Sequence, residues 1–492
     1  MKKLILGCLL ALFASGCNDN EPEQKPVELK ISFAGENPVE FTVGEQKRLA
    51  FTVTGDDLEG LTFAAEPDEA LSGWTVVVSA GREGDAYAGA LDVTASATPS
   101  ETAVTLTVTD RNGKPWSATT PTLTAVQAPV TAIDLSRDGT ANCYIVSEAG
   151  DYMFDAAVRG NGSGDNAAIA LADGMKADWL WVTKGLEQEI SAVSLDAGKG
   201  RIFFTAAGAA KGNAVIALAD AAGEIVWSWH LWFTPEPRMV TYANGRVLLD
   251  RSLGAVGTTP GSAEAYGLYY QWGRKDPFIG PSTYKISSGQ GAAMYNDSGS
   301  RTYVTMVASS AETGTMDYAV KHPLAFVTGV AESNNDWLWS KSDAGWSSDG
   351  DAGAKSVNDP CPYGWRVAPS AAFAGLEIVG TPAAGDEEKF GWTLTDGKAE
   401  SFFMGGGRRR YDDGKIQNIY IPKDEAKMKL YTRADIAQPW EGLYWTTAVD
   451  GTQSNALHFW YEKLTGTGGI APAEAYARAN GMQVRCVKVE NM

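Results

Sequence analysis

Nine residues in the second half of the chain, Asp359 to Val367, place a cysteine, a tryptophan and an arginine close together. A thiol beside a cation is a combination that enzymes use for nucleophilic chemistry, because the positive charge favours the thiolate. Pro360 and Pro362 flank the cysteine, and since proline fixes φ and lacks an amide donor, the stretch is expected to form a rigid loop. Cys361 is therefore either a reactive group or an anchor of the fold, and the rest of the sequence favours the anchor.

Other residues that carry chemistry are sparse. The three histidines, His230, His322 and His458, are far apart, and no His-x-x-x-His or Cys-x-x-Cys spacing of a metal site occurs. No nucleophile motif accompanies a histidine, as a serine triad requires. Asp412 and Asp413 are neighbours in a predicted turn, whereas glycosidase carboxylates come from separate elements. The sequence thus predicts no catalytic site and no cofactor, with calcium at the two aspartates as an unsupported alternative.

Aromatic residues in polar surroundings indicate binding instead. Three tryptophans lie in a stretch rich in Gly, Asn and Asp, where ring stacking plus hydrogen bonds suits carbohydrate or peptide recognition. The alternative, that these rings pack a long loop onto its domain, stays open. A turn rich in arginine and aspartate adds polar candidates. The predicted ligand-binding residues are Trp337, Trp339, Trp346, Arg408, Tyr411 and Asp412.

The N-terminus predicts export and lipidation. Lys2 and Lys3 precede an apolar run, Leu4 to Ala14, that is too short to span a bilayer and fits a signal peptide. Residues 1–16 are interpreted as this signal. The small residues before Cys17 resemble a bacterial lipobox, in which that cysteine is acylated and anchors the chain to outer-membrane lipid. An ordinary secretory signal is the alternative.

Residues 17–27 form a polar, acidic tether that cannot fold alone. This segment resembles the surface-export signal of Bacteroidetes lipoproteins, which implies an outer-membrane lipoprotein on the cell surface. A periplasm-facing lipoprotein is the alternative. The formal net charge of −19 argues against nucleic acid as a partner.

Short alternating strands organise the chain up to residue 237. Val104, Leu106 and Val108 share one face of such a strand, and turn signals separate it from others, which predicts an immunoglobulin-like β-sandwich over residues 28–128. Residues 129–237 are predicted to form a second β-sandwich with hairpins across residues 142–156 and 213–232. Trp227 in its last strand is assigned to core packing, with a sugar-stacking platform as the alternative. Cys143 is expected to be a buried free thiol.

Residues 238–492 contain a series of motifs in a fixed order. They include Leu249-Asp250-Arg251-Ser252-Leu253-Gly254, Tyr269-Tyr270-Gln271-Trp272-Gly273, Asp359 to Val367, Tyr444-Trp445-Thr446-Thr447 and Val484-Arg485-Cys486-Val487. In order and character these resemble the Fibrobacter succinogenes major paralogous domain, a family related to C-type-lectin-like and sulfatase-modifying-factor-like folds. The segment before it resembles β-domains of fimbrillin-associated Bacteroidetes surface lipoproteins.

The resemblance implies an α+β domain whose long loops carry any binding surface. Cys361 and Cys486 then lie in one domain of an exported protein, which favours a disulfide between them over two buried thiols. The expected fold class is mostly β and multidomain, with two immunoglobulin-like β-sandwiches followed by a C-type-lectin-like domain. The expected function is non-enzymatic adhesion, or glycan or protein binding through residues 238–492. A structural accessory or tip subunit of a fimbria-like assembly is the alternative, and a sulfatase-modifying type of enzyme is a third.

Overall fold

The computed structural model describes most of the chain beyond the tether. The described residues are 28–35, 37–68, 73–126, 132–162, 167–208, 210–281, 292–343, 345–347, 354–381, 390–417, 439–462 and 464–489. The predicted signal peptide, the predicted lipidation site Cys17 and the tether lie outside this set. Among the described residues, no helix has the length and apolar character needed to cross a membrane.

The chain is mostly β and divides into two compact units, Met1–Val130 and Thr131–Met492. The first division lies close to the boundary expected between residues 128 and 129. The boundary expected between residues 237 and 238 lies inside the second unit, so these two predicted domains form one body.

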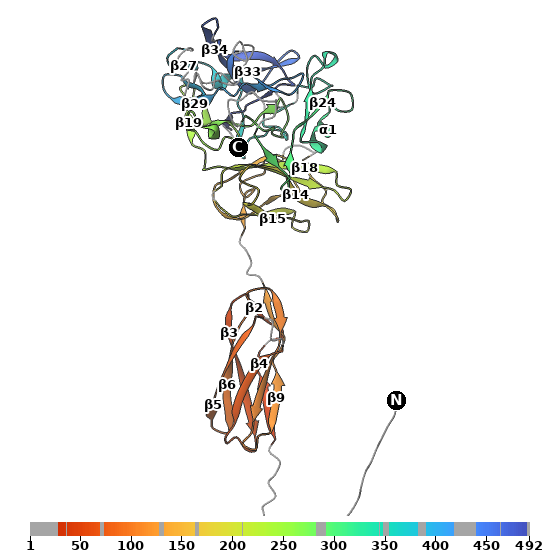
Figure 1. The fold of residues 1–492 in the computed structure, drawn as a ribbon, viewed down its shortest axis with the longest axis vertical. Coiled ribbons are helices and arrows are strands. Elements are labelled where there is room, and N and C mark those ends of the chain that lie inside the picture. The colour runs from red at the N-terminus through yellow and green to blue at the C-terminus, as the bar shows by residue number, and fades with distance from the viewer. Residues whose placement is uncertain are drawn as a thin grey trace, which may run out of the picture. The chain divides into compact units, whose positions relative to one another are not determined.

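The first unit is an immunoglobulin-like β-sandwich (Figure 1). Its sheets have the strand orders β1-β3-β6-β5, β2-β10-β7 and β4-β8-β9. In β8 the side chains of Val104, Leu106 and Val108 are fully buried while the threonines between them are not, which confirms the predicted alternation. The strands are β1 (Leu29–Phe33), β2 (Val39–Thr42), β3 (Gln46–Gly55), β4 (Thr62–Pro67), β5 (Thr75–Glu83), β6 (Ala86–Thr94), β7 (Ser100–Thr102), β8 (Val104–Thr109), β9 (Pro115–Thr119) and β10 (Leu123–Val126).

The second unit begins with two sheets around a shared core. Their strand orders are β11-β13-β16-β15 and β12-β18-β17-β14-β22-β23. The predicted hairpin across residues 213–232 is the antiparallel pair β17 and β18, and β18 is buried from Trp227 to Phe233. The strands are β11 (Ile133–Asp134), β12 (Cys143–Val146), β13 (Gly150–Asp155), β14 (Lys176–Thr183), β15 (Ile190–Asp196), β16 (Arg201–Ala206), β17 (Gly212–Ala219), β18 (Ile225–Phe233), β22 (Met294–Tyr295) and β23 (Arg301–Thr302).

The predicted hairpin across residues 142–156 is wrong. Strand β12 pairs in parallel with β18, whereas β13 pairs with β11 and β16 in the other sheet. Tyr144 of β12 and Phe154 of β13 nevertheless enter the same core, with their rings 5.0 Å apart. The turn between the two strands therefore carries the chain from one sheet to the facing sheet, because both strands bury an apolar side against a common core.

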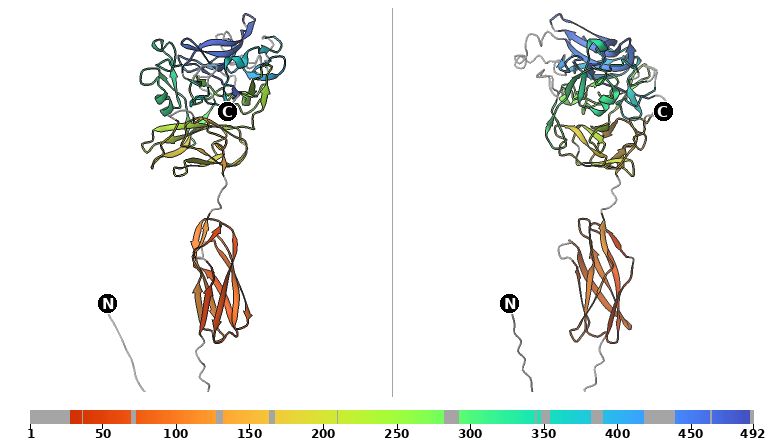
Figure 2. Two further views of the ribbon diagram at one scale, coloured as in Figure 1. Left: turned by 180° about the vertical axis from the view of Figure 1, so that it is seen from behind. Right: turned by 90° about the vertical axis from the view of Figure 1, so that its right-hand side faces the viewer.

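The rest of the second unit consists of short strands and irregular backbone. Its sheets have the orders β19-β20-β36-β26, β21-β35-β30-β31, β24-β25, β27-β28-β29 and β32-β33-β34. In both Figure 1 and Figure 2 the blue strands β33 and β34 lie at the end of this unit opposite to β14 and β15. The strands are β19 (Met239–Thr241), β20 (Val247–Leu249), β21 (Tyr270–Gln271), β24 (Thr305–Ala308), β25 (Ala325–Thr328), β26 (Trp365–Val367), β27 (Glu377–Ile378), β28 (Gly391–Thr395), β29 (Glu400–Met404), β30 (Arg408–Arg409), β31 (Ile416–Gln417), β32 (Trp440–Asp450), β33 (Gln453–Glu462), β34 (Thr467–Ala477), β35 (Gly481–Met482) and β36 (Cys486–Lys488), and the helices are α1 (Met316–Lys321) and the 3-10 turns η1 (Ala263–Ala265), η2 (Ala331–Ser333) and η4 (Ser370–Phe373).

The stretch from Asp359 to Val367 is an anchor of the fold. Cys361 forms the predicted disulfide with Cys486, and both residues are fully buried. The carboxylate of Asp359 accepts hydrogen bonds from the backbone amides of Cys361 (2.8 Å) and Val367 (2.9 Å). Lys355 Nζ donates to the carbonyl oxygens of Cys361 (2.6 Å) and Trp365 (2.8 Å). The loop is thus fixed from both sides, and neither sulfur is available for chemistry.

A single hydrophobic cluster joins the two segments that the sequence predicted as separate domains. It contains Trp181 and Trp232 from the first segment and Cys361 and Trp445 from the second. Trp232 Nε1 donates to the Ala255 carbonyl oxygen (3.0 Å). The shared core explains why residues 131–492 form one unit.

Asn142 and Cys143 also lie where these two segments meet. Asn142 Nδ2 donates to the carbonyl oxygens of Val357 (2.8 Å) and Asp359 (2.9 Å). Cys143 lies in the shared cluster and is the free cysteine among the described residues, as expected. Its complete burial raises the pKa of the thiol. Cys143 is therefore an inert packing group.

Candidate functional site

Two of the predicted ligand-binding tryptophans are core residues. Trp337 is 1% exposed and Trp346 is 0% exposed. Their indole Nε1 atoms donate to the carbonyl oxygens of Trp272 (2.7 Å) and Arg274 (2.9 Å). The binding prediction is wrong for both, because the rings pack the loop onto the domain and their only polar atoms are satisfied by backbone.

The other predicted residues do not form one site. Trp339 is 37% exposed, and Asp412 is held by Arg410 through a 2.8 Å hydrogen bond from Nε. Tyr411 packs against the buried Trp337 cluster. Among the described residues there is no group of three His, Cys, Asp or Glu side chains able to hold a metal ion. The aspartate turn is therefore an ion-paired loop.

Arg408 is the predicted residue that does lie in a polar cluster. This outer cluster, as we call it, lies on one face of the β32-β33-β34 sheet and on the neighbouring strand β30. On the opposite face of β33, Leu457 and Phe459 are fully buried in the core. The outer cluster consists of Arg408, Glu441, His458, Trp460, Glu474 and Tyr476.

The strand register brings these residues together. Glu441 on β32 is the cross-strand partner of Trp460, two residues along β33 from His458. Side chains opposite each other and two residues apart share a face of a sheet. Glu474 on β34 pairs with Ala456, which lies on the same face. Three strands therefore supply these polar side chains, beside Leu443 and Ala456 of the same face, which are fully buried in the shared core.

His458 is at the centre of the outer cluster and is 6% exposed. Its Nδ1 atom lies 2.7 Å from Glu474 Oε2 and 3.1 Å from the Tyr476 hydroxyl. Its Nε2 atom lies 3.5 Å from Glu441 Oε1. Trp460 stacks on the imidazole with ring centroids 4.6 Å apart. The histidine is thus held between two carboxylates and beneath an indole ring.

The rim of the outer cluster is open to solvent. The Glu474 side chain is 44% exposed, and Trp460 and Tyr476 are half-buried. Burial, and then the negative charges of Glu474 and Glu441, raise the pKa of Tyr476, so its hydroxyl remains a hydrogen-bond donor. The guanidinium carbon of Arg408 lies 5.3 Å from the Tyr476 ring centroid. The surface offers aromatic faces, a carboxylate and a cation.

Sequence reasoning missed five of the six residues of the outer cluster. The only local signal is the alternation that places His458 and Trp460 on one side of β33, and nothing near them in sequence indicates which residues face them. Their partners come from strands that pair only in the folded sheet.

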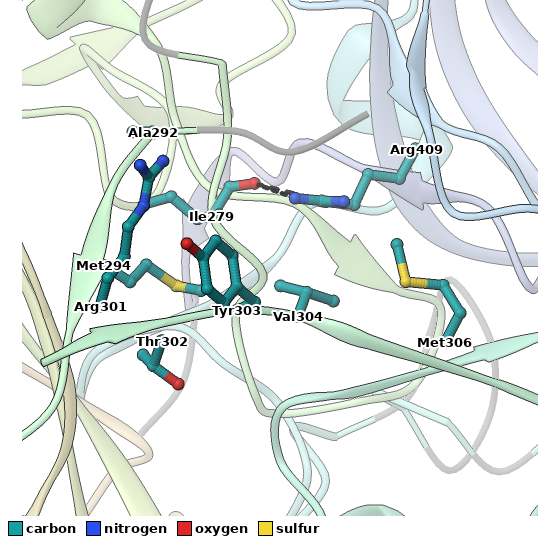
Figure 3. A pocket seen from close by; sticks show the side chains of 9 residues that line it. All are labelled: Ile279, Ala292, Met294, Arg301, Thr302, Tyr303, Val304, Met306 and Arg409. Atoms are coloured by element: carbon teal, nitrogen blue, oxygen red, sulfur yellow. Dashed lines mark hydrogen bonds between the residues drawn. The ribbon is translucent and has the colours of Figure 1, made fainter. Parts of the chain in front are cut away.

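A small cavity beside Arg409 carries no ligand site. It has a volume of about 10 Å3, which is room for about one water molecule. Figure 3 shows the Arg409 guanidinium bonded to the Ile279 carbonyl oxygen, with Tyr303 and Met306 nearby. Burial lowers the pKa of Arg409 to about 10. The guanidinium supports backbone carbonyl groups, since it also donates to the Gly414 oxygen (2.9 Å).

No protein-family model matches the chain, and no curated protein matches it. Among solved structures, the D00-D0 domain of intimin is 16% identical, with 42% of this chain and 96% of that chain covered and a TM-score of 0.17. The tandem Ig repeats of Dlar are 13% identical, with 42% and 98% covered and a TM-score of 0.15. Domains 5–6 of the S-layer protein SbsC are 11% identical, with 42% and 100% covered and a TM-score of 0.16. Likeness at this level carries no argument about function.

Proposed function

We propose that the chain is a lipid-anchored, non-enzymatic protein of the outer cell surface that binds a glycan or a protein ligand. In this proposal Cys17 carries the lipid, and residues 238–492 are a C-type-lectin-like domain of the Fibrobacter major paralogous type. The observation that carries the binding role is the outer cluster. Its half-exposed aromatic rings and exposed carboxylate lie on a sheet whose opposite face is core.

The chemistry of the outer cluster suits a ligand with both apolar and hydroxyl or amide groups. Trp460 and Tyr476 offer apolar faces, and Glu474 and Arg408 offer an acceptor and a donor. These side chains are already held by one another, so a ligand would order few of them on binding. Since Cys361 and Cys486 are buried in a disulfide, a mechanism based on a reactive cysteine has no support.

Replacing Trp460 by alanine in the mature chain is expected to weaken ligand binding roughly 30-fold, or about 2 kcal/mol, as for an aromatic residue central to an interface. The measurement is binding of the wild-type chain and the variant to a glycan array and to immobilised extracellular-matrix proteins. Trp339→Ala is the matched control, because this ring is 37% exposed and lies outside the outer cluster. Equal loss in both variants, or silence of the wild type on both surfaces, contradicts the proposal.

Replacing Cys17 by alanine is expected to release the chain from the outer membrane, because the acyl chains are its proposed anchor. Membrane and soluble fractions are compared by immunoblot, with Cys143→Ala as the control that stays membrane-bound. Protease treatment of intact cells separates the cell surface from the periplasm. Retention of the Cys17→Ala chain in the membrane argues against lipid anchoring.

The alternative, a subunit of a fimbria-like assembly, is favoured by one feature of the first unit. Strand β5 is a nine-residue edge strand bonded to β6 on one side, and its Val77 is 65% exposed. Such an edge can accept a further strand. Fibre subunits that co-purify with the full chain, and are lost on Val77→Lys, are the result expected under this alternative.

A further inference from the structure

A pocket of about 350 Å3 lies where β18, α1 and the loop at Val357 and Asn358 meet. We call it the junction pocket, because its lining comes from both sides of the boundary predicted at residues 237 and 238. A volume of this size is at the lower end of the range of small-molecule sites. Figure 1 shows α1 beside β18, at a distance from the blue strands that carry the outer cluster.

The walls of the junction pocket are mostly apolar. The lining includes the half-buried Val226 of β18, Met316 and Val320 of α1, and Val357. Trp227 contributes little surface, because its side chain is 3% exposed. Pockets that bind small molecules combine such walls with a few polar groups that fix orientation.

The buried tryptophan beneath the lining is held rigidly. Trp227 Nε1 donates to Asn142 Oδ1 (3.1 Å), and Lys275 Nζ lies 4.5 Å from its ring centroid. Lys275 is itself buried and donates to Asp276 Oδ1 (2.6 Å) and to the Ser228 carbonyl oxygen (3.0 Å). A lining supported in this way loses little conformational freedom when a ligand binds.

The rim of the junction pocket is polar and balanced in charge. Lys321 Nζ lies 2.8 Å from Glu224 Oε1 and 3.1 Å from Asp317 Oδ2. Arg159 also lines the pocket, and its guanidinium carbon lies 5.6 Å from the Trp227 ring centroid. The charges of the two cations, Lys321 and Arg159, and of the two carboxylates, Glu224 and Asp317, sum to zero. The Asn358 amide lies 3.9 Å from the Met316 sulfur, which is a weak acceptor, so it can donate to a ligand.

This lining discriminates between classes of ligand. Because the two cations and two carboxylates of the lining offset each other, neither an anionic nor a cationic ligand gains net electrostatic attraction there. A wholly apolar ligand would remove water from these charges without replacing its hydrogen bonds. A neutral ring with an apolar face and several hydroxyl groups fits both parts of the pocket. Its apolar face can pack on the walls, and its hydroxyl groups can bond the polar rim, because each hydroxyl both donates and accepts.

We propose that the junction pocket binds the neutral sugar end of a glycan, with the apolar ring face on Val226, Met316 and Val320. The hydroxyl groups are bonded by the rim carboxylates, Lys321 and Asn358. This site goes beyond the proposed function of the outer cluster, since it uses none of its residues. It also requires both segments of the second unit, so residues 238–492 alone would lack half of it.

The test uses the mature chain and the neutral methyl glycosides of glucose, galactose, mannose and N-acetylglucosamine, with saturation-transfer NMR and calorimetric titration. At least one glycoside is expected to bind in the millimolar range. Val320→Trp, which fills the pocket, and Asn358→Ala, which removes a rim donor, are each expected to weaken that binding about tenfold or more. Val379→Trp is the matched control, because this exposed valine lies outside the lining.

Three results would overturn the inference. The first is no binding of any neutral glycoside, and the second is binding that both pocket variants leave unchanged. The third is tighter binding of methyl glucuronide or glucosamine than of the neutral glycosides. Unfolding curves of the two variants show whether the fold is intact. Loss on Trp460→Ala with no effect of Val320→Trp leaves the outer cluster as the binding site and rejects the junction pocket, so the two proposals fail separately.

Discussion

Reduction of the disulfide, or its replacement in a Cys361→Ala and Cys486→Ala double variant, is expected to lower the free energy of unfolding of the second unit by roughly 4–5 kcal/mol. The two cysteines are 125 residues apart, so their bond removes much of the freedom of the unfolded chain. It also joins the loop at Cys361 to β36, which pairs separately with β26 through Val367 and Cys486. The measurement is urea unfolding of the mature chain, followed by tryptophan fluorescence, with and without dithiothreitol.

The matched control for this experiment is Cys143→Ala. Cys143 is free and lies in the same buried cluster, so its replacement removes a buried thiol without removing a bond. Dithiothreitol is expected to destabilise the control by the same amount as the wild type and to leave the double variant unaffected. A wild-type transition that does not move on reduction contradicts the prediction.

Replacement of Arg478 by methionine is expected to cost roughly 3–5 kcal/mol, as for the loss of one partner of a buried ion pair. The side chain is 0% exposed, and its Nη1 atom lies 3.4 Å from Asp336 Oδ2. It also donates to Asp343 Oδ1 (2.5 Å) and lies 4.7 Å from the ring centroid of Trp272. Lys199→Met is the control, because this exposed partner of Asp196 is expected to contribute less than about 1 kcal/mol.

The pH dependence of the destabilisation by Arg478→Met tests whether the unpaired Asp336 carboxylate causes it. Burial raises the pKa of Asp336 from 3.8 to about 6, although Arg478 opposes the shift. Between these values the folded chain keeps a proton that the unfolded chain releases, so the free energy of unfolding falls as the pH rises, by about 3 kcal/mol from this group. Without Arg478 the pKa of Asp336 rises further, so the free energy of unfolding continues to fall up to a higher pH.

The Arg478→Met variant is therefore expected to lose more stability at pH 8 than at pH 5. Adding Asp336→Asn removes the buried carboxyl group, so the double variant is expected to lose this extra pH dependence. Urea unfolding at both pH values measures the difference. An equal loss at pH 5 and pH 8 in the Arg478→Met variant argues against an unpaired Asp336 as its cause.

The same residues explain why part of the site was mispredicted. The polar neighbours of Trp337 suggested a solvent-exposed loop, but Asp336 is fully buried against Arg478. Asn334 and Asn335 have φ angles of 54° and 59°, so their role is to turn the backbone. The polar residues of this stretch form turns and a buried ion pair. From a single sequence, polar residues with these roles look the same as polar residues of a solvent-exposed loop.

Local patterns were otherwise reliable where the determining contacts are close in sequence. The alternation in Val104 to Thr109 and the β17–β18 hairpin were predicted from neighbouring residues. The disulfide, between cysteines far apart in sequence, was predicted from the expected oxidising compartment and the placement of both cysteines in one predicted domain. The crossing from β12 to β13 and the outer cluster depend on pairings between distant strands. Nothing in the spacing of Glu441, His458 and Glu474 reveals that they meet.

The position of β36 has a consequence for truncation. This strand lies between β20 and β26, where Val487 pairs with both Leu248 and Arg366. The middle of this sheet is thus supplied by a segment far along the chain from both of its neighbours, so the sheet cannot close before residues 486–488 are made. A nonsense mutation just before Cys486 would therefore remove the centre of the sheet together with the disulfide partner of Cys361.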